Sequence, residues 1–133
     1  MELLCTIDKL IIIHLKSYLD TLENFYSTLD GNVIEVHGKK SKEDNSRFLL
    51  LRMGINFKNR EFYIYNIYIP REDRKHGLGF GLLSFIYQIT KTMDFELFLA
   101  DMTDSFREKM IRRKARETTI FDCLQVVDTT DLT

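Results

Sequence analysis

One short segment, Arg74-Lys75-His76-Gly77-Leu78-Gly79, combines the residue types that bind phosphate groups. Its glycines let the backbone turn tightly and present successive N–H groups to an anion. A helical pattern of apolar residues follows directly, so the positive end of a helix dipole would point at the same anion. Arg74 and Lys75 add positive charge, and His76 is a further candidate ligand. Together these features predict a binding site for a pyrophosphate.

Two familiar phosphate loops do not fit this segment. A P-loop requires Lys and then Ser or Thr after its last glycine, where this chain has Phe80 and Gly81. A dinucleotide-binding fingerprint requires a third glycine at the position of Leu82. The pattern Gln/Arg-x-x-Gly-x-Gly/Ala, which is typical of acetyltransferase loops, fits without adjustment. A glycine-rich turn that only caps a helix is the remaining alternative.

Apolar periodicity predicts the elements that position this segment. The spacing of Leu15, Leu19, Leu22, Tyr26 and Leu29 predicts a helix over residues 6–29, in one piece or two. Further helices are expected over 80–93 and from 103 or 104 to about 116, and strands over 33–36, 47–55, 61–70, 96–100 and 118–127. The strands at 61–70 and 96–100 are joined through a helix and should be parallel, whereas the earlier strands can pair as antiparallel hairpins. The sequence thus predicts an α/β (α+β) fold with a mixed, mostly antiparallel central sheet and helices on both faces.

With its flanks, the segment resembles the GCN5-related N-acetyltransferase (GNAT) family, which has the acyl-CoA N-acyltransferase fold. Ile67-Tyr68-Ile69 matches the aliphatic pair that precedes the family's arginine, and Leu82-Leu83 matches the two aliphatics early in its helix. The similarity covers residues 60–116 well and the flanks loosely. It implies one GNAT-like domain over residues 1–133, in which the family's fourth and fifth strands are parallel and splay apart.

The resemblance implies that acetyl-CoA is the cofactor and that the chain is an N-acetyltransferase acting on a primary amine of a small molecule or protein. Backbone N–H groups of the loop would hold the pyrophosphate, and the pantetheine arm would run beside the strand that precedes it. The implied cofactor-binding residues are Ile67, Tyr68, Ile69, Arg74, Lys75, His76, Gly77, Leu78, Gly79, Phe80 and Asp104.

The acid and base that are usual in the family are not at their expected positions. Counting back from Ile69 along one face of the strand gives Ile67, Tyr65, Tyr63 and Glu61. Tyr63 thus falls near the usual glutamate base and Glu61 one step further out. A tyrosine is a poor base at neutral pH unless its pKa is lowered. Tyr63, Glu61 and Tyr65 are therefore the candidate catalytic residues.

The family's usual acid, a tyrosine in the helix that follows residues 96–100, has no counterpart here. Met110 and Ile111 occupy its place, and Asp104 or Ser105 replaces the asparagine that commonly opens this helix. Catalysis remains feasible because positioning can carry much of the reaction. The alternative is a catalytically inactive module of the same fold that binds CoA or a partner protein.

Composition excludes some classes of function and leaves others open. A net charge of −1 argues against a chain that binds polyanions over its whole surface. Residues 103–117 nevertheless carry six cations (Arg107, Lys109, Arg112, Arg113, Lys114, Arg116) and three acids (Asp104, Glu108, Glu117). This helix could contact the CoA 3′-phosphate, an acidic partner or nucleic acid, but a solvated face is the commoner use of such charge. Nucleic acid is the least favoured of these partners.

The cysteines and histidines point to no redox or metal chemistry. Cys5 and Cys123 make no disulfide framework, which predicts a reducing, cytoplasmic compartment. The three histidines lack metal-like spacing, so no metal site is expected. Neither a membrane-spanning helix nor a signal peptide is expected. The sequence leaves open whether the chain forms a homodimer.

Overall fold

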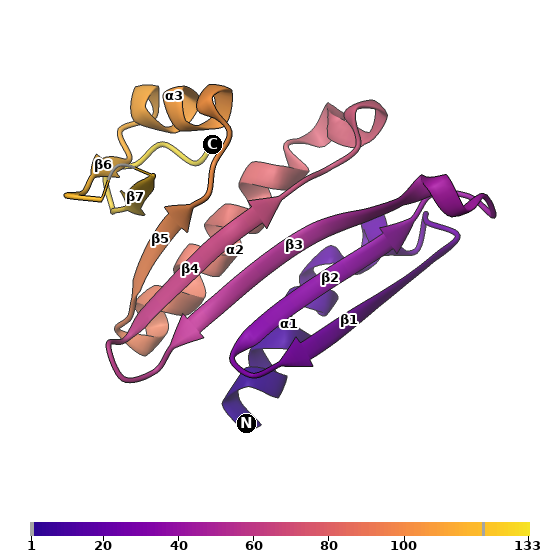
Figure 1. Cartoon of the computed structure of the whole chain (residues 1–133), viewed down its shortest axis with the longest axis horizontal. Coiled ribbons are helices and arrows are strands. Elements are labelled where there is room, and N and C mark those ends of the chain that lie inside the picture. The colour runs from indigo at the N-terminus through magenta and orange to yellow at the C-terminus, as the bar shows by residue number, and fades with distance from the viewer. Residues whose placement is uncertain (1, 121) are drawn as a thin grey trace.

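The chain folds as three helices and seven strands in the computed structural model, which describes residues 2–120 and 122–133 (Figure 1). The side chains of Lys75 and His76 lie outside this description. The helices are α1 (Glu2–Leu19), α2 (Leu78–Met93) and α3 (Asp104–Arg112), with two short 3₁₀ helices, η1 (Asp44–Ser46) and η2 (Arg71–His76). The strands are β1 (Asn24–Asp30), β2 (Val33–Lys39), β3 (Arg47–Asn56), β4 (Glu61–Ile67), β5 (Glu96–Ala100), β6 (Arg116–Glu117) and β7 (Cys123–Val126).

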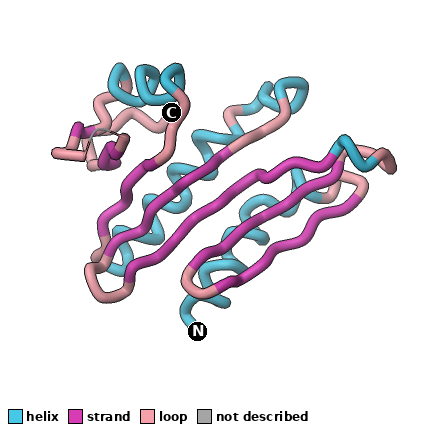
Figure 2. Tube along the Cα trace, in the orientation of Figure 1, coloured by secondary structure: helices cyan, strands magenta, loops and turns pink. Residues whose placement is uncertain are grey.

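All seven strands form one sheet in the order β1-β2-β3-β4-β5-β7-β6 (Figure 2). Only β4 and β5 run parallel, and every other neighbouring pair is antiparallel. The parallel pair is connected through α2, as a parallel connection requires. The predicted fold class, a mixed and mostly antiparallel sheet with helices, is therefore confirmed.

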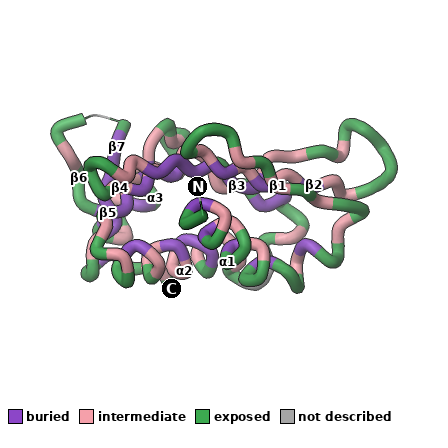
Figure 3. The backbone as a smooth tube through the Cα atoms, turned by 90° about the horizontal axis from the view of Figure 1, so that it is seen from below, coloured by how far each residue is buried: buried purple, intermediate pink, exposed green. Residues whose placement is uncertain are grey.

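The two long helices pack side by side on one face of the sheet (Figures 1 and 3). On α1 the buried positions Leu4, Ile7, Ile11, Leu15 and Leu19 recur every three or four residues, and each is at most 1 % exposed. Full burial of a side chain of this size stabilises the folded state by about 1.5–3 kcal/mol relative to leaving it exposed. Helices were expected on both faces of the sheet. Instead, α1 and α2 lie on the same face, and α3 lies past the carboxyl end of β5.

The helix predicted over residues 6–29 is wrong in its second half. α1 ends at Leu19, and Tyr26 and Leu29 belong to strand β1 instead. β1 pairs with β2 over its whole length, from Asn24 opposite Lys39 onward. Tertiary pairing has overridden a helix-like spacing here. The extra strand makes Glu61–Ile67 the fourth strand and Glu96–Ala100 the fifth.

The remaining differences concern boundaries. The strand predicted over 61–70 ends at Ile67, and the last predicted helix ends at Arg112 rather than near residue 116. Within the terminal strand predicted over 118–127, the described residues form only the short strand β7, and β6 precedes that range. No helix within residues 2–120 and 122–133 is both long and apolar enough to cross a membrane.

Candidate functional site

The parallel strands β4 and β5 pair only at their amino-terminal ends. Their register runs from Glu61 opposite Glu96 to Ile64 opposite Leu99 and stops there. β4 continues to Ile67, paired on its other side with β3 alone. Beyond Ile64 one edge of β4 is therefore unpaired, and residues of both strands line a small opening of about 100 Å³ at this point.

β4 also contains a β-bulge at this position. Its pairing with β3 passes from Ile64, opposite Met53, directly to Asn66, opposite Arg52. Tyr65 is the extra residue. A bulge breaks the alternation of side chains between the two faces of a strand.

Because of this bulge, the side chains of β4 do not alternate between the two faces of the sheet as the sequence count assumed. Tyr63 lies opposite Gly54 and Ile67 lies opposite Leu51, and directly opposed residues share a face. Gly54 and Leu51 are three residues apart on β3 and so lie on opposite faces. The expectation that Tyr63 and Ile67 share one face is therefore wrong.

The glycine segment forms the start of α2. Gly77 has φ +64° and ψ 28°, a left-handed conformation that glycine adopts without steric strain. It is the N-cap of α2, and no described side chain caps the amino terminus of this helix. The first intrahelical bond runs from the Gly81 N–H to the Gly77 carbonyl (2.8 Å). The N–H groups of Leu78, Gly79 and Phe80 are therefore unsatisfied within the helix and are available to an anion.

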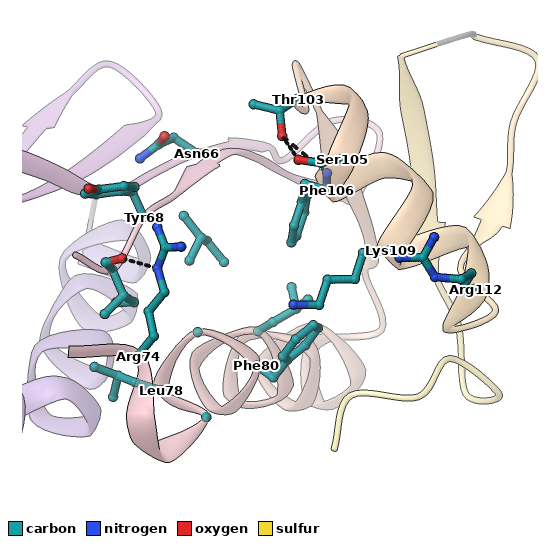
Figure 4. Close-up of a pocket in the computed structure, with 15 residues that line it drawn as sticks. Asn66, Tyr68, Arg74, Leu78, Phe80, Thr103, Ser105, Phe106, Lys109 and Arg112 are labelled. Carbon is teal, nitrogen blue, oxygen red and sulfur yellow. Dashed lines mark hydrogen bonds between the residues drawn. The ribbon is translucent and has the colours of Figure 1, made fainter. Parts of the chain in front are cut away.

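A cleft of about 800 Å³ lies between this loop, the end of β4 and α3 (Figure 4). It is lined by Asn66, Ile67, Tyr68, Ile69, Arg74, Gly77, Leu78, Gly79, Phe80, Leu83, Thr103, Ser105, Phe106, Lys109 and Arg112. Six of these residues have aliphatic or phenyl side chains, three are cationic and none is acidic. The cleft therefore suits a ligand with an extended, largely uncharged part and an anionic part.

Arg74 fixes the loop against the end of β4. Its Nε donates a hydrogen bond to the Ile69 carbonyl (2.6 Å), and its guanidinium lies over the Tyr68 ring, 5.4 Å from the centroid (Figure 4). These two contacts leave the terminal nitrogens of the guanidinium at the cleft, where they can donate to an anion.

Helix α3 forms the opposite wall of the cleft. Thr103 is its N-cap and accepts a hydrogen bond from the Phe106 N–H (3.3 Å). Ser105, Lys109 and Arg112 follow at spacings of four and three, which place them on one side of a helix. The Lys109 ammonium reaches into the cleft and stands 5.0 Å from the centroid of the Phe80 ring (Figure 4). None of these three residues was among the predicted cofactor-binding residues, although the sequence suggested that the basic helix could contact the CoA 3′-phosphate.

Most of the predicted cofactor-binding residues come together here. Eight of them line the cleft: Ile67, Tyr68, Ile69, Arg74, Gly77, Leu78, Gly79 and Phe80. The side chains of Lys75 and His76 are outside the described part of the chain. Asp104 is the exposed first residue of α3 and is not among the lining residues.

None of the three predicted catalytic residues is among the residues that line the cleft. Glu61 begins β4, six residues from Ile67, which corresponds to roughly 20 Å along a strand. The Tyr63 hydroxyl donates to Glu61 Oε1 (3.0 Å), and its ring stacks on Phe98 with centroids 5.2 Å apart. Burial and then the Glu61 carboxylate raise the pKa of Tyr63 to about 12, so it keeps its proton at neutral pH. Tyr65 borders the small opening between β4 and β5.

Comparison with known proteins gives limited similarity. No family model matches the sequence, and no curated protein matches it. A nourseothricin acetyltransferase is 17% identical with a TM-score of 0.42 over 62% of this chain, which spans about half (49%) of that protein. An aminoglycoside acetyltransferase from an uncultured soil metagenomic sample is 17% identical with a TM-score of 0.44, over 84% of each chain. These values identify no family, so the function is argued from the cleft itself.

Proposed function

We propose that this chain binds acetyl-CoA in the cleft and transfers the acetyl group to a primary amine of a small molecule or protein. The observation that carries the proposal is the amino terminus of α2, whose N-cap Gly77 provides no capping side chain and which lies in a cleft whose described lining residues include three cations and no acid. An anion is stabilised there by backbone N–H groups, by the helix dipole and by Arg74 at once.

The rest of the cleft suits the remainder of such a ligand. The pantetheine arm carries amide groups, and β4 beyond Ile64 has one backbone edge that is unpaired by β5. Amides can bond to such an edge as a neighbouring strand would. Ile67 and Ile69 supply apolar surface beside it. The bound donor would supply a thioester, and this chain's residues would orient it at the bulge near Tyr65 and Asn66.

Transfer of the acetyl group also requires a base, and the three candidate residues differ in chemistry and position. The amine must lose a proton before it attacks, and Tyr63 is a poor base because its pKa is raised. A carboxylate such as Glu61 is chemically the better base. However, Glu61 accepts a hydrogen bond from the Tyr63 hydroxyl and lies at the start of β4, far from Ile67. Tyr65 borders the small opening between β4 and β5. This arrangement favours a second candidate function, a module of this fold that binds CoA without transferring its acyl group.

Calorimetric titration with acetyl-CoA and with desulfo-CoA tests the proposal, together with an assay for free thiol on a panel of amines and peptides. We expect both ligands to bind and at least one amine to release CoA. If neither ligand binds to the folded protein, the proposed site is wrong. Binding without turnover would favour the non-catalytic module.

An acidic residue at position 79 should block the site without unfolding it. A carboxylate in the first turn of a helix is favourable for the helix itself, and a side chain at Gly79 would meet no protein atom within 4 Å. Gly79→Asp should therefore fold normally but occupy and repel the anion site, and we expect acetyl-CoA affinity to fall about tenfold or more. Calorimetry and thermal melting measure the two effects.

Gly81→Asp is the matched control for this variant. Gly81 has equally open surroundings on the same helix but does not line the cleft. Gly81→Asp adds the same charge about half a helical turn further along α2. The affinity for acetyl-CoA should therefore change less than about threefold. Equal losses in both variants would mean that net charge, rather than the position of the carboxylate, governs binding.

A further inference from the structure

Four cations of the α3 region differ in what they face. Lys109 and Arg112 line the cleft on the wall opposite the glycine loop (Figure 4). Arg107 and Arg113 do not line it; each lies within 4.0 Å of a carboxylate oxygen, of Glu117 at 3.5 Å and of Asp131 at 3.9 Å. In the described part of the chain, Lys109 and Arg112 have no such carboxylate. The two α3 cations that face the cleft therefore have no carboxylate of the described chain within 4.0 Å.

Lys109 is also held in position. Its ammonium stands 5.0 Å from the centroid of Phe80, a residue of the first turn of α2, on a ring that Arg113 also approaches, at 4.0 Å. A cation–π contact orients a cation without consuming its ability to donate hydrogen bonds to an anion. Lys109 therefore presents a charged donor inside the cleft, and Arg112 stands one turn further along the same wall.

We propose that Lys109 and Arg112 bind a second anionic group of the donor, separate from the pyrophosphate at the start of α2. This inference rests on the proposed function. The unsatisfied N–H groups of α2 and the guanidinium of Arg74 already serve one anionic group on their side of the cleft. A cationic pair on the facing wall, spaced to share one ligand, fits a further phosphate or carboxylate. In a CoA thioester that group is either the 3′-phosphate of the ribose or a carboxylate on the acyl chain.

Titration with four ligands separates these two sources. CoA and dephospho-CoA differ only in the 3′-phosphate, whereas succinyl-CoA and acetyl-CoA differ in an acyl carboxylate. The double variant Lys109→Gln/Arg112→Gln should lose roughly tenfold or more in affinity for the ligand that carries the recognised group. Its affinity for the matched ligand without that group should stay within about threefold of wild type. Lys114→Gln, which removes a nearby charge that does not line the cleft, should bind all four ligands as wild type does.

Each outcome decides the proposal. A selective loss for CoA over dephospho-CoA assigns the pair to the 3′-phosphate, and a selective loss for succinyl-CoA over acetyl-CoA assigns it to the acyl carboxylate. An equal loss for all four ligands, or no loss, overturns the second site while leaving CoA binding itself intact. If the wild-type protein binds none of the four, the proposed function fails and the inference fails with it.

Discussion

Replacing Gly77 with valine should weaken acetyl-CoA binding by at least about a hundredfold, and calorimetric titration measures the loss. Gly77 has φ +64°. A β-branched residue is strongly disfavoured there, and even an ordinary residue costs about 1–2 kcal/mol in this region. The backbone would relieve that strain by leaving the left-handed conformation, which turns the N–H groups of Leu78 and Gly79 away from the anion. Losing two charge-assisted hydrogen bonds of roughly 1.5–3 kcal/mol each accounts for the expected change.

Gly31 provides a matched control for this substitution. It lies in the β1–β2 turn with φ +61°, and an added Cβ would meet nothing within 4 Å there, as at Gly77. Gly31→Val should therefore lower the melting temperature about as much as Gly77→Val does. Its affinity for acetyl-CoA should equal that of wild type. If Gly77→Val also binds normally, the anion site is not at the start of α2.

The fold was largely predictable because its central elements carry local signals. The strands at Arg47–Asn56 and Glu61–Ile67, helix α2 and strand β5 each show a clear apolar pattern with turn residues between them. β1 could not be recognised in this way. Its half-buried positions Phe25, Ser27 and Leu29 alternate, yet Tyr26 and Leu29 also continue the three- and four-residue spacing of α1. Only pairing with β2 decides between the two interpretations, and that pairing is non-local.

The site was predictable in part for the same reason. The loop and the end of β4 are contiguous in sequence, so their proximity follows from the turn between them. The bulge at Tyr65 was not recognised in the Tyr- and Ile-rich sequence of β4, and it invalidated the count toward Tyr63. The side of α3 that carries Ser105, Lys109 and Arg112 was readable from spacing. Which side faces the cleft depends on how α3 packs against Phe80, and one helix sequence does not contain that information.

We expect Asp73 to hold the glycine loop in place through its hydrogen bonds to residues of other elements. It lies in η2, directly before Arg74, and its Oδ2 accepts hydrogen bonds from the Tyr18 hydroxyl of α1 (2.6 Å) and from the Lys40 ammonium after β2. The Asp73 side chain is only 20% exposed. Asp73→Ala would leave a part-buried ammonium and hydroxyl without their acceptor, which should lower the free energy of unfolding by about 2 kcal/mol. Thermal melting should show a drop of about 5–10 °C.

The same substitution should weaken acetyl-CoA binding about tenfold, because Arg74 and Gly77 follow the lost anchor directly. Asp128 offers a matched control at the other end of α2, where it accepts hydrogen bonds from Tyr87 (2.5 Å) and Lys91 (2.7 Å). Asp128→Ala removes a similar Tyr–Asp–Lys cluster that is more exposed and remote from the cleft. Its affinity should match wild type. Comparable losses of affinity in both variants would show that general loosening of α2, rather than release of the loop, weakens binding.

The pH dependence of the melting temperature shows whether the Asp73 carboxylate, rather than another group, provides this stabilisation. The hydrogen bonds from Lys40 and then Tyr18 hold the pKa of Asp73 below its ordinary value of 3.8. A lowered pKa of an acid means that its stabilisation is fully present above the unfolded-state pKa and is lost as the pH falls through the folded-state pKa. The gap in melting temperature between wild type and Asp73→Ala should therefore be constant from about pH 6 to 8 and narrow only below about pH 4. A gap that closes near neutral pH would assign the stabilisation to a group other than this carboxylate.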